Sequence, residues 1–304
     1  MSAAAHSLHR RVALLVTAVA VLLAGRAAAL DVGAQALLLA AAVVVTGLPH
    51  GAVDHLRAEP VLRPSFGRLW LPAFLALYTG VAALVAGAWW LWPVPSLFAF
   101  LALSLHHFGS GDARDAIGVL AHGSTPILMP CVAHPEATAA LFALLTGGEA
   151  SAWARGLQTA QPWLLAGWGA ALAGLLLARR RGPYGPVGEL LAIAAAGWWL
   201  PPLLSFGLYF CVWHAPRHIL QVCQELWPGP VRPALRRFGR AAIAMTIAAV
   251  VGGVAVAWAM PGEPDVLRRG LQLVFVGLAA LTVPHLLVTE ALRRRQAAPV
   301  PAAA

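Results

Sequence analysis

Long apolar segments dominate this sequence and constrain its fold more than any other feature. Most are close to the ~20 residues that a helix needs to cross the hydrocarbon core of a membrane. Ten can be delimited, at residues 11–29, 33–52, 69–92, 95–110, 117–134, 160–178, 186–200, 202–222, 240–260 and 267–291. The connections between them are too short for a soluble domain. We therefore expect an all-α, polytopic integral membrane helix bundle of about ten transmembrane helices.

The composition agrees with a membrane protein. Of the 304 residues, 60% are hydrophobic and 11% are charged, whereas soluble domains carry roughly 25% charged residues. All 21 basic residues are arginines, and the net charge is +9. Because these arginines lie between the apolar segments, they indicate orientation in a membrane and not nucleic-acid binding. The three cysteines show no metal or disulfide spacing and are expected to be buried.

The arginines are divided unequally between the two sides of a ten-helix arrangement. If the N-terminus is cytoplasmic, the opposite side holds only Arg26, Arg155, Arg268 and Arg269. The cytoplasmic side then holds the others, at the N-terminus, in the even-numbered connections and after the last segment, except Arg217, which lies within the segment 202–222. Cytoplasmic loops are enriched in arginine and lysine. This distribution predicts that both termini are cytoplasmic and that the protein crosses a membrane several times.

We divide the chain into three parts. Residues 1–32 form an extra N-terminal helix, which resembles a signal peptide in its basic start and its Ala27-Ala28-Ala29; we expect this helix to be retained. Residues 33–292 form a single transmembrane domain that is expected to carry the chemistry. Residues 293–304 form a basic tail that is rich in alanine and proline.

Seven histidines occupy the cytoplasmic leaflet of this topology. They come from five different segments, and they are His50, His106, His107, His122, His214, His218 and His285. Ionisable groups at membrane depth are expensive and usually serve a function. A lone membrane histidine is more often a hydrogen-bonding group between helices, and this interpretation suits His122 and His285 best. The shared leaflet favours one common site for the others.

Helical spacing indicates which histidines could bind one ion. His214 and His218 are four residues apart and therefore share one face of a helix. His50 and Asp54 have the same spacing, so we expect Asp54 to orient His50 by accepting its second ring N–H. His55 is rotated by roughly 140° from His50 in a continuous helix, and its role is left open. Pro216 should kink the helix of the histidine pair and free a backbone carbonyl.

The sequence gives less precise expectations for the other polar residues near the site. His106 precedes His107 and its role is open, whereas Asp112 can turn back toward the site after two glycines. Arg217 needs an acidic partner such as Asp112 or Asp54 if it is buried beside the histidine pair. The other three histidines, His6, His9 and His134, are expected at the surface.

A set of four imidazoles without an obligatory carboxylate suits a transition metal such as Fe, Cu or Zn. Apolar walls around such a site suit a hydrophobic substrate that arrives through the lipid. The residues alone therefore predict a metal centre in the cytoplasmic leaflet with an apolar substrate, and they leave the metal and the reaction open.

Four sequence blocks resemble the Brp/Blh family, the bacterial membrane β-carotene 15,15′-dioxygenases. The blocks are GLPHGAVDH at 47–55, HHFGSGD at 106–112, LPPLLSFGLYFCVWHAPRHI at 200–219 and VFVGLAALTVPHLL at 274–287. Each motif alone would be weak, but the four in this order are a strong signal. They run from the second apolar segment to the last, so only the first helix and the tails have no counterpart.

The resemblance implies a non-haem Fe(II) held by His50, His107, His214 and His218. It also implies O₂-dependent cleavage of the central double bond of β-carotene to two molecules of all-trans retinal. We interpret Asp54, Asp112, Arg217 and His285 as groups that support the ligands or line the cavity. β-Carotene, O₂ and membrane lipid are then the expected partners. A rhodopsin in the same cell is a natural consumer of retinal, although nothing in the sequence points to one.

Two other functions compete with this interpretation. A histidine-rich membrane di-iron desaturase or hydroxylase would carry HxxHH boxes, and none of the 11 histidines forms one. A transition-metal transporter would place its site at the midplane, with acidic residues within helices, whereas these histidines lie off-centre. A retinal-binding photoreceptor is excluded because its Schiff base needs a lysine and the sequence has none.

Overall fold

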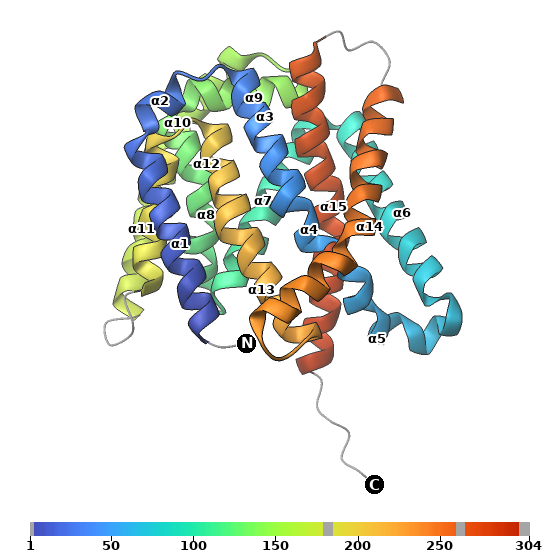
Figure 1. Cartoon of the computed structure of the whole chain (residues 1–304). Helices are drawn as coiled ribbons and strands as arrows, with labels where there is room; N and C mark the ends of the chain where they lie inside the picture. The colour runs from blue at the N-terminus through green and yellow to red at the C-terminus, as the bar shows by residue number, and fades with distance from the viewer. Residues whose placement is uncertain (1–2, 179–184, 260–264, 298–304) are drawn as a thin grey trace.

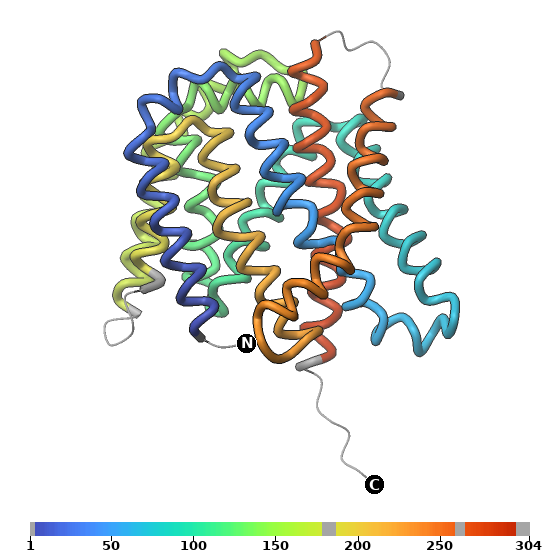
Figure 2. Tube along the Cα trace, in the orientation of Figure 1, coloured from blue at the N-terminus to red at the C-terminus, as the bar shows by residue number. Residues whose placement is uncertain are grey.

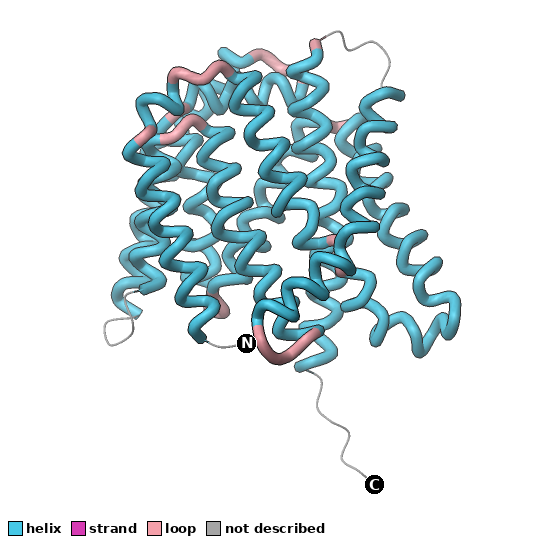
Figure 3. The backbone as a smooth tube through the Cα atoms, in the orientation of Figure 1, coloured by secondary structure: helices cyan, strands magenta, loops and turns pink. Residues whose placement is uncertain are grey.

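The computed structural model describes residues 3–178, 185–259 and 265–297, and all regular secondary structure in these ranges is helical (Figure 3). In chain order the elements are α1 (Ala3–Leu22), α2 (Ala24–Ala28), α3 (Val32–Ala42), the π-helix η1 (Val43–Gly47), α4 (Leu48–Gly51), α5 (Asp54–Phe66), the 3-10 helix η2 (Gly67–Leu69), α6 (Trp70–Leu91), α7 (Pro93–Asp112), α8 (Ala116–Ala133), α9 (Pro135–Thr146), α10 (Ala150–Ala178), α11 (Gly185–Trp199), α12 (Pro202–Leu208), the π-helix η3 (Tyr209–His214), α13 (Ala215–Leu226), α14 (Val231–Ala259) and α15 (Val266–Ala297). The prediction of an all-α protein is confirmed for the described residues.

The long helices run side by side as one bundle (Figures 1 and 2). Within the described residues, six segments are long and apolar enough to cross a membrane: Ala4–Leu22, Val32–Leu91, Ala116–Ala133, Ala150–Leu177, Val231–Trp258 and Val266–Arg295. The chain is therefore a helical membrane protein. The first turn of α1 and the last turn of α15 lie at the same end of the bundle, the lower end in Figure 1.

Prolines interrupt the helical segments that carry His50, the pair His214 and His218, and His285. Leu48 separates Pro49 from η1, Ala215 separates Pro216 from η3, and Pro284 lies inside α15. Proline has no N–H and clashes with the carbonyl four residues before it. The wider turns of the π-helices η1 and η3 accommodate this clash, and such turns are frequent at functional sites. The expected distortion before Pro216 is therefore present as a π-helix.

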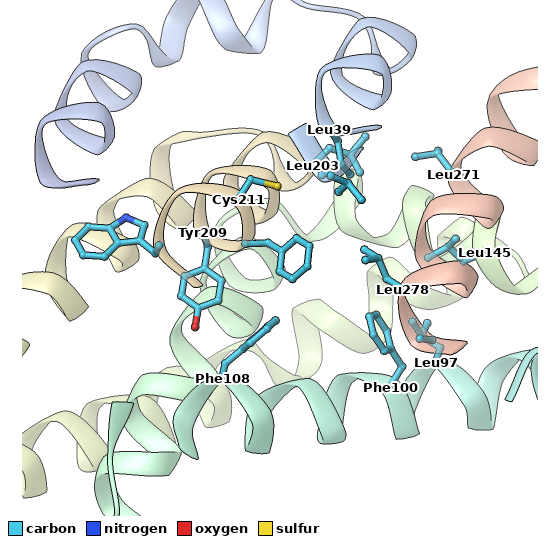
Figure 4. Close-up of a cluster of buried hydrophobic side chains, with 14 of the residues drawn as sticks. Leu39, Leu97, Phe100, Phe108, Leu145, Leu203, Tyr209, Cys211, Leu271 and Leu278 are labelled. Atoms are coloured by element: carbon cyan, nitrogen blue, oxygen red, sulfur yellow. The ribbon is translucent and has the colours of Figure 1, made fainter. Parts of the chain in front are cut away.

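A cluster of buried apolar side chains lies between the helices (Figure 4). In its lower part, the rings of Phe108 on α7 and Tyr209 on η3 contact each other with their centroids 4.9 Å apart. Phe108 also contacts His214 at 4.8 Å. Because lipid is as apolar as these side chains, this packing stabilises the fold through close contact and not through exclusion of water. The cluster thereby forms one wall of the site described below.

Glycines bring α7 and α8 into close backbone contact. A Cβ atom added to Gly109 on α7 would lie 2.0 Å from the carbonyl oxygen of Val119 on α8, and one added to Gly123 would lie 1.9 Å from that of Leu105. Small residues permit such approach between membrane helices. The contact fixes the segment of α7 that carries His107. The three cysteines are buried and unpaired, as expected.

Candidate metal centre

Five histidine rings from different helices converge inside the bundle, and we call them the histidine ring: His50 on α4, His107 on α7, His214 on η3, His218 on α13 and His285 on α15. The centroid of His50 lies 5.6, 5.5 and 5.1 Å from those of His214, His218 and His285. His107 closes the group at 4.7 Å from His214 and 5.3 Å from His285. All four predicted ligands are thus brought together, with a fifth histidine among them.

The spacing of ring nitrogens fits a single metal ion. The Nε2 atoms of His107 and His214 are 3.1 Å apart. Two nitrogens that each lie ~2.1 Å from one ion at right angles are about 3.0 Å apart. Ligand atoms of His50, His107 and His285 also lie within 4.8 Å of one another. These distances allow several imidazoles to reach a common centre.

Hydrogen bonds leave nitrogens of the ring free to bind an ion. His50 donates from Nδ1 to the carbonyl oxygen of Gly47, which leaves its Nε2 available. The Nε2 atoms of His218 and His285 are buried and have no hydrogen-bond partner among the described residues. An unpaired buried polar atom costs about 1–3 kcal/mol, so two such nitrogens in one cluster fit a site that binds a metal ion. Neutral imidazoles are typical ligands of Fe, Cu and Zn.

The expectation that Asp54 orients His50 is wrong. Asp54 Oδ2 instead accepts a 2.7 Å hydrogen bond from Nδ1 of His285. The reason is a break in the helix: α4 ends at Gly51 and α5 begins at Asp54, so the four-residue spacing does not place His50 and Asp54 on one face. His50 uses the carbonyl of its own preceding turn, that of Gly47.

Two residues that the sequence analysis did not assign to the site support Asp54. Arg57, which the sequence analysis counted only among the arginines that indicate orientation in the membrane, lies 3.7 Å from Asp54 and 3.1 Å from Glu225. The hydroxyl of Tyr78 on α6 lies 3.4 Å from Asp54 Oδ2. The sequence offered one signal for Tyr78, which is a polar hydroxyl in the middle of the apolar segment 69–92. The signal for His285 was its Pro-His pair, which repeats Pro49-His50.

Arg217 has the acidic partner that was expected. It forms ion pairs with Asp112 and, at 2.6 Å, with Glu189 on α11. Its guanidinium also lies 5.8 Å from the ring centroid of Trp213, in a cation–π arrangement. The arginine thereby joins α7, α11 and α13 at a position next to His218 and about one turn from His214.

Helix α1 contacts the π-helix that carries His214. The carbonyl of Val212, which Pro216 frees by removing its usual helical donor, accepts a 2.9 Å hydrogen bond from Nε2 of His9. The indole N–H of Trp213 donates to the hydroxyl of Thr17 at 2.9 Å. The expectation that His9 is a surface residue is therefore wrong, and the first helix helps to hold the site.

Three further histidines lie outside the histidine ring. His106 is exposed although its neighbour His107 is buried. His55 is partly buried and donates from Nδ1 to the carbonyl of Ala52 at 3.2 Å. His122 is buried in α8.

Two cavities of different character adjoin the ring. An apolar cavity of about 230 Å³ touches His50 and His285 and is lined by residues of α6, α14 and α15, among them Tyr78, Ala249 and Leu278. A polar cavity of about 710 Å³ touches the other three ring histidines and is lined by charged groups that include Arg217 and Arg293. The histidine ring therefore lies between an apolar and a polar compartment.

Comparison with known proteins identifies similar sequences. A family model described as beta-carotene 15,15'-dioxygenase matches residues 41–293. A probable beta-carotene 15,15'-dioxygenase, Blh, of Halobacterium salinarum is 33% identical over 292 residues, which cover 85% of this chain and 84% of that protein. A beta-carotene 15,15'-dioxygenase of an uncultured marine bacterium (66A03) is 30% identical over 258 residues, which cover 82% of this chain and 91% of that protein. No solved structure matches the chain.

Proposed function

Because this chain belongs to the beta-carotene 15,15'-dioxygenase family, we propose that it cleaves the central 15,15′ double bond of β-carotene with O₂. The double bond breaks and each of its carbons becomes the aldehyde carbon of one all-trans retinal. The observation that carries the proposal is the convergence of four histidines from three separate apolar segments beside an apolar cavity.

The metal in this proposal is Fe(II), held by His50, His107, His214 and His218. Bound Fe(II) supplies the redox chemistry that activates O₂. The protein holds the imidazoles in place: Gly47 fixes His50, the close contact of α7 with α8 fixes His107, and Arg217 with α1 braces the segment of His214 and His218. The unpaired buried Nε2 of His218 supports this assignment.

The apolar cavity provides a route for a carotenoid from the membrane. Leu75 and Thr79 on α6 and Ala248 on α14 line it and are exposed on the bundle surface. A hydrophobic polyene dissolved in lipid can enter there, whereas the charged lining of the polar cavity disfavours it. The substrate thus approaches from the side of His50 and His285.

Replacing Ala249 by tryptophan should block this route, because the indole would occupy much of the cavity next to the ring. We expect retinal formation to fall at least ~10-fold, with iron content unchanged. The matched control is Ile247→Trp, since Ile247 is 57% exposed on the same helix and does not line the cavity. Equal activity of the two variants, measured by chromatography of retinal, would place the substrate elsewhere.

In this proposal the chain crosses a bacterial inner membrane ten times with both termini cytoplasmic. The ten apolar segments lie largely within α1–α2, α3–α4, α6, α7, α8, α10, α11, α12–α13, α14 and α15. The position of the first turn of α1 and the last turn of α15 at one end of the bundle supports an even number of crossings. A reporter enzyme that works only in the cytoplasm should be active when it is fused after Ala304. Activity of a reporter that works only in the periplasm, fused at the same position, would refute this topology.

Expression in a bacterium that accumulates β-carotene tests the reaction. We expect the colour to bleach as retinal forms, in air and with iron supplied. A His50→Ala variant that still inserts into the membrane is the control and should leave the cells coloured. Persistent colour with the unmodified protein under these conditions would rule out the proposed cleavage, and a change in acyl chains instead would favour a desaturase.

A further inference from the structure

The last helix, α15, contributes a histidine that the four-ligand assignment does not count among the ligands. His285 is 3% exposed, and its ring centroid lies 5.1, 5.3 and 5.0 Å from those of His50, His107 and His218. Its ligand atom is within 4.8 Å of ligand atoms of both His50 and His107. The ring of His285 therefore lies as close to its neighbours as the rings of the four predicted ligands lie to one another.

The hydrogen bonding of His285 is that of a metal ligand. Its Nδ1 donates a 2.7 Å hydrogen bond to Asp54 Oδ2, so the unprotonated Nε2 has a lone pair that can bind a metal ion. That Nε2 is buried and has no hydrogen-bond partner in the described part of the chain. A carboxylate that accepts from the second nitrogen of a metal-bound histidine is a common arrangement, because it fixes the ring and increases its basicity.

Asp54 is itself held in place. It is 1% exposed, so its charge needs a partner, and Arg57 supplies one at 3.7 Å while the Tyr78 hydroxyl lies 3.4 Å away. A hydrogen bond that merely joined two helices would account for Nδ1 of His285. It would leave Nε2 buried and unpaired, at a cost of about 1–3 kcal/mol.

We propose that His285 is a fifth ligand of the metal and that Asp54 is the positioning residue that orients it. The proposal rests on the proposed function for the presence of the metal. Its test is metal binding and does not require the cleavage reaction.

Titration of the purified, detergent-solubilised full chain with Co(II) provides this test, since Co(II) is a visible probe of its own coordination. Wild type is compared with His285→Asn, which retains a donor near the position of Nδ1 and removes Nε2, and with Asp54→Asn. We expect the Kd for Co(II) to rise at least ~10-fold in each variant and the visible spectrum of the His285→Asn complex to change in intensity and position. His106→Asn, at an exposed histidine outside the ring, should behave as wild type.

An unchanged Kd and spectrum in His285→Asn would overturn the inference, even if cleavage were lost, because His285 would then face the substrate and not the metal. If His285→Asn is not monodisperse in size-exclusion chromatography, Asp54→Asn decides by the same criteria. Tight binding of Co(II) by the wild type without any retinal formation would refute the proposed reaction and leave this inference standing.

Discussion

Replacing His107 by alanine should abolish both iron binding and retinal formation, whereas replacing its neighbour His106 should change neither. His107 is 8% exposed, and its Nε2 is 3.1 Å from that of His214. His106 is exposed on the same helix. Loss of a residue that hydrogen-bonds to a metal ligand typically lowers metal affinity or activity 10- to 100-fold. Loss of the ligand itself should therefore reduce activity by at least ~100-fold.

The pair is a matched comparison because both variants remove one imidazole from the same turn of α7. Iron can be measured by elemental analysis of the purified proteins, and retinal by chromatography. Full iron content in His107→Ala would contradict the assignment of this residue as a ligand. A loss of iron in His106→Ala would show that the adjacent histidine had been chosen wrongly.

The second large effect is expected at the contact between α7 and α8. Alanine at Gly109 or Gly123 would place a Cβ atom 2.0 or 1.9 Å from a backbone carbonyl oxygen. Backbone cannot move aside as the end of a side chain can, so the two helices must separate. Overpacking of a tight interior lowers the free energy of unfolding by about 1–3 kcal/mol and occasionally by more. We expect each substitution to lower it by ~3 kcal/mol or more and to displace His107.

Gly111→Ala is the control for this prediction, because no described atom lies within 4 Å of a Cβ at that position on the same helix. Unfolding in a denaturing detergent measures the loss of stability, and the iron content reports the displacement of His107. Stability of Gly123→Ala equal to that of Gly111→Ala would show that α7 and α8 are not in backbone contact.

The helices could be predicted from the sequence because the apolar character of a segment is a local property. The clustering of His50, His107, His214 and His218 was also accessible, through topology and the resemblance to a family. The partner of His285 was not. It depends on how α5 and α15 lie against each other, and a spacing argument assumed a continuous helix where the chain breaks between Gly51 and Asp54.

The support given by α1 was missed for a similar reason. His9 and Thr17 look like ordinary residues of an N-terminal helix until their partners, Val212 and Trp213, are known. The partner of His9 is the carbonyl of Val212, which is free because of Pro216. The proline predicted that a carbonyl would need a donor, but no sequence pattern indicates that the donor comes from a residue 203 positions away.

The central claim is symmetric, oxygen-dependent cleavage of β-carotene by this chain. The most direct measurement incubates the purified protein, loaded with Fe(II), with β-carotene and quantifies every product by chromatography and mass spectrometry, with and without O₂. We expect retinal as the only carotenoid product, two molecules for each β-carotene consumed, and none without O₂. Two fragments of unequal length, or unchanged β-carotene in the presence of iron and O₂, would contradict it.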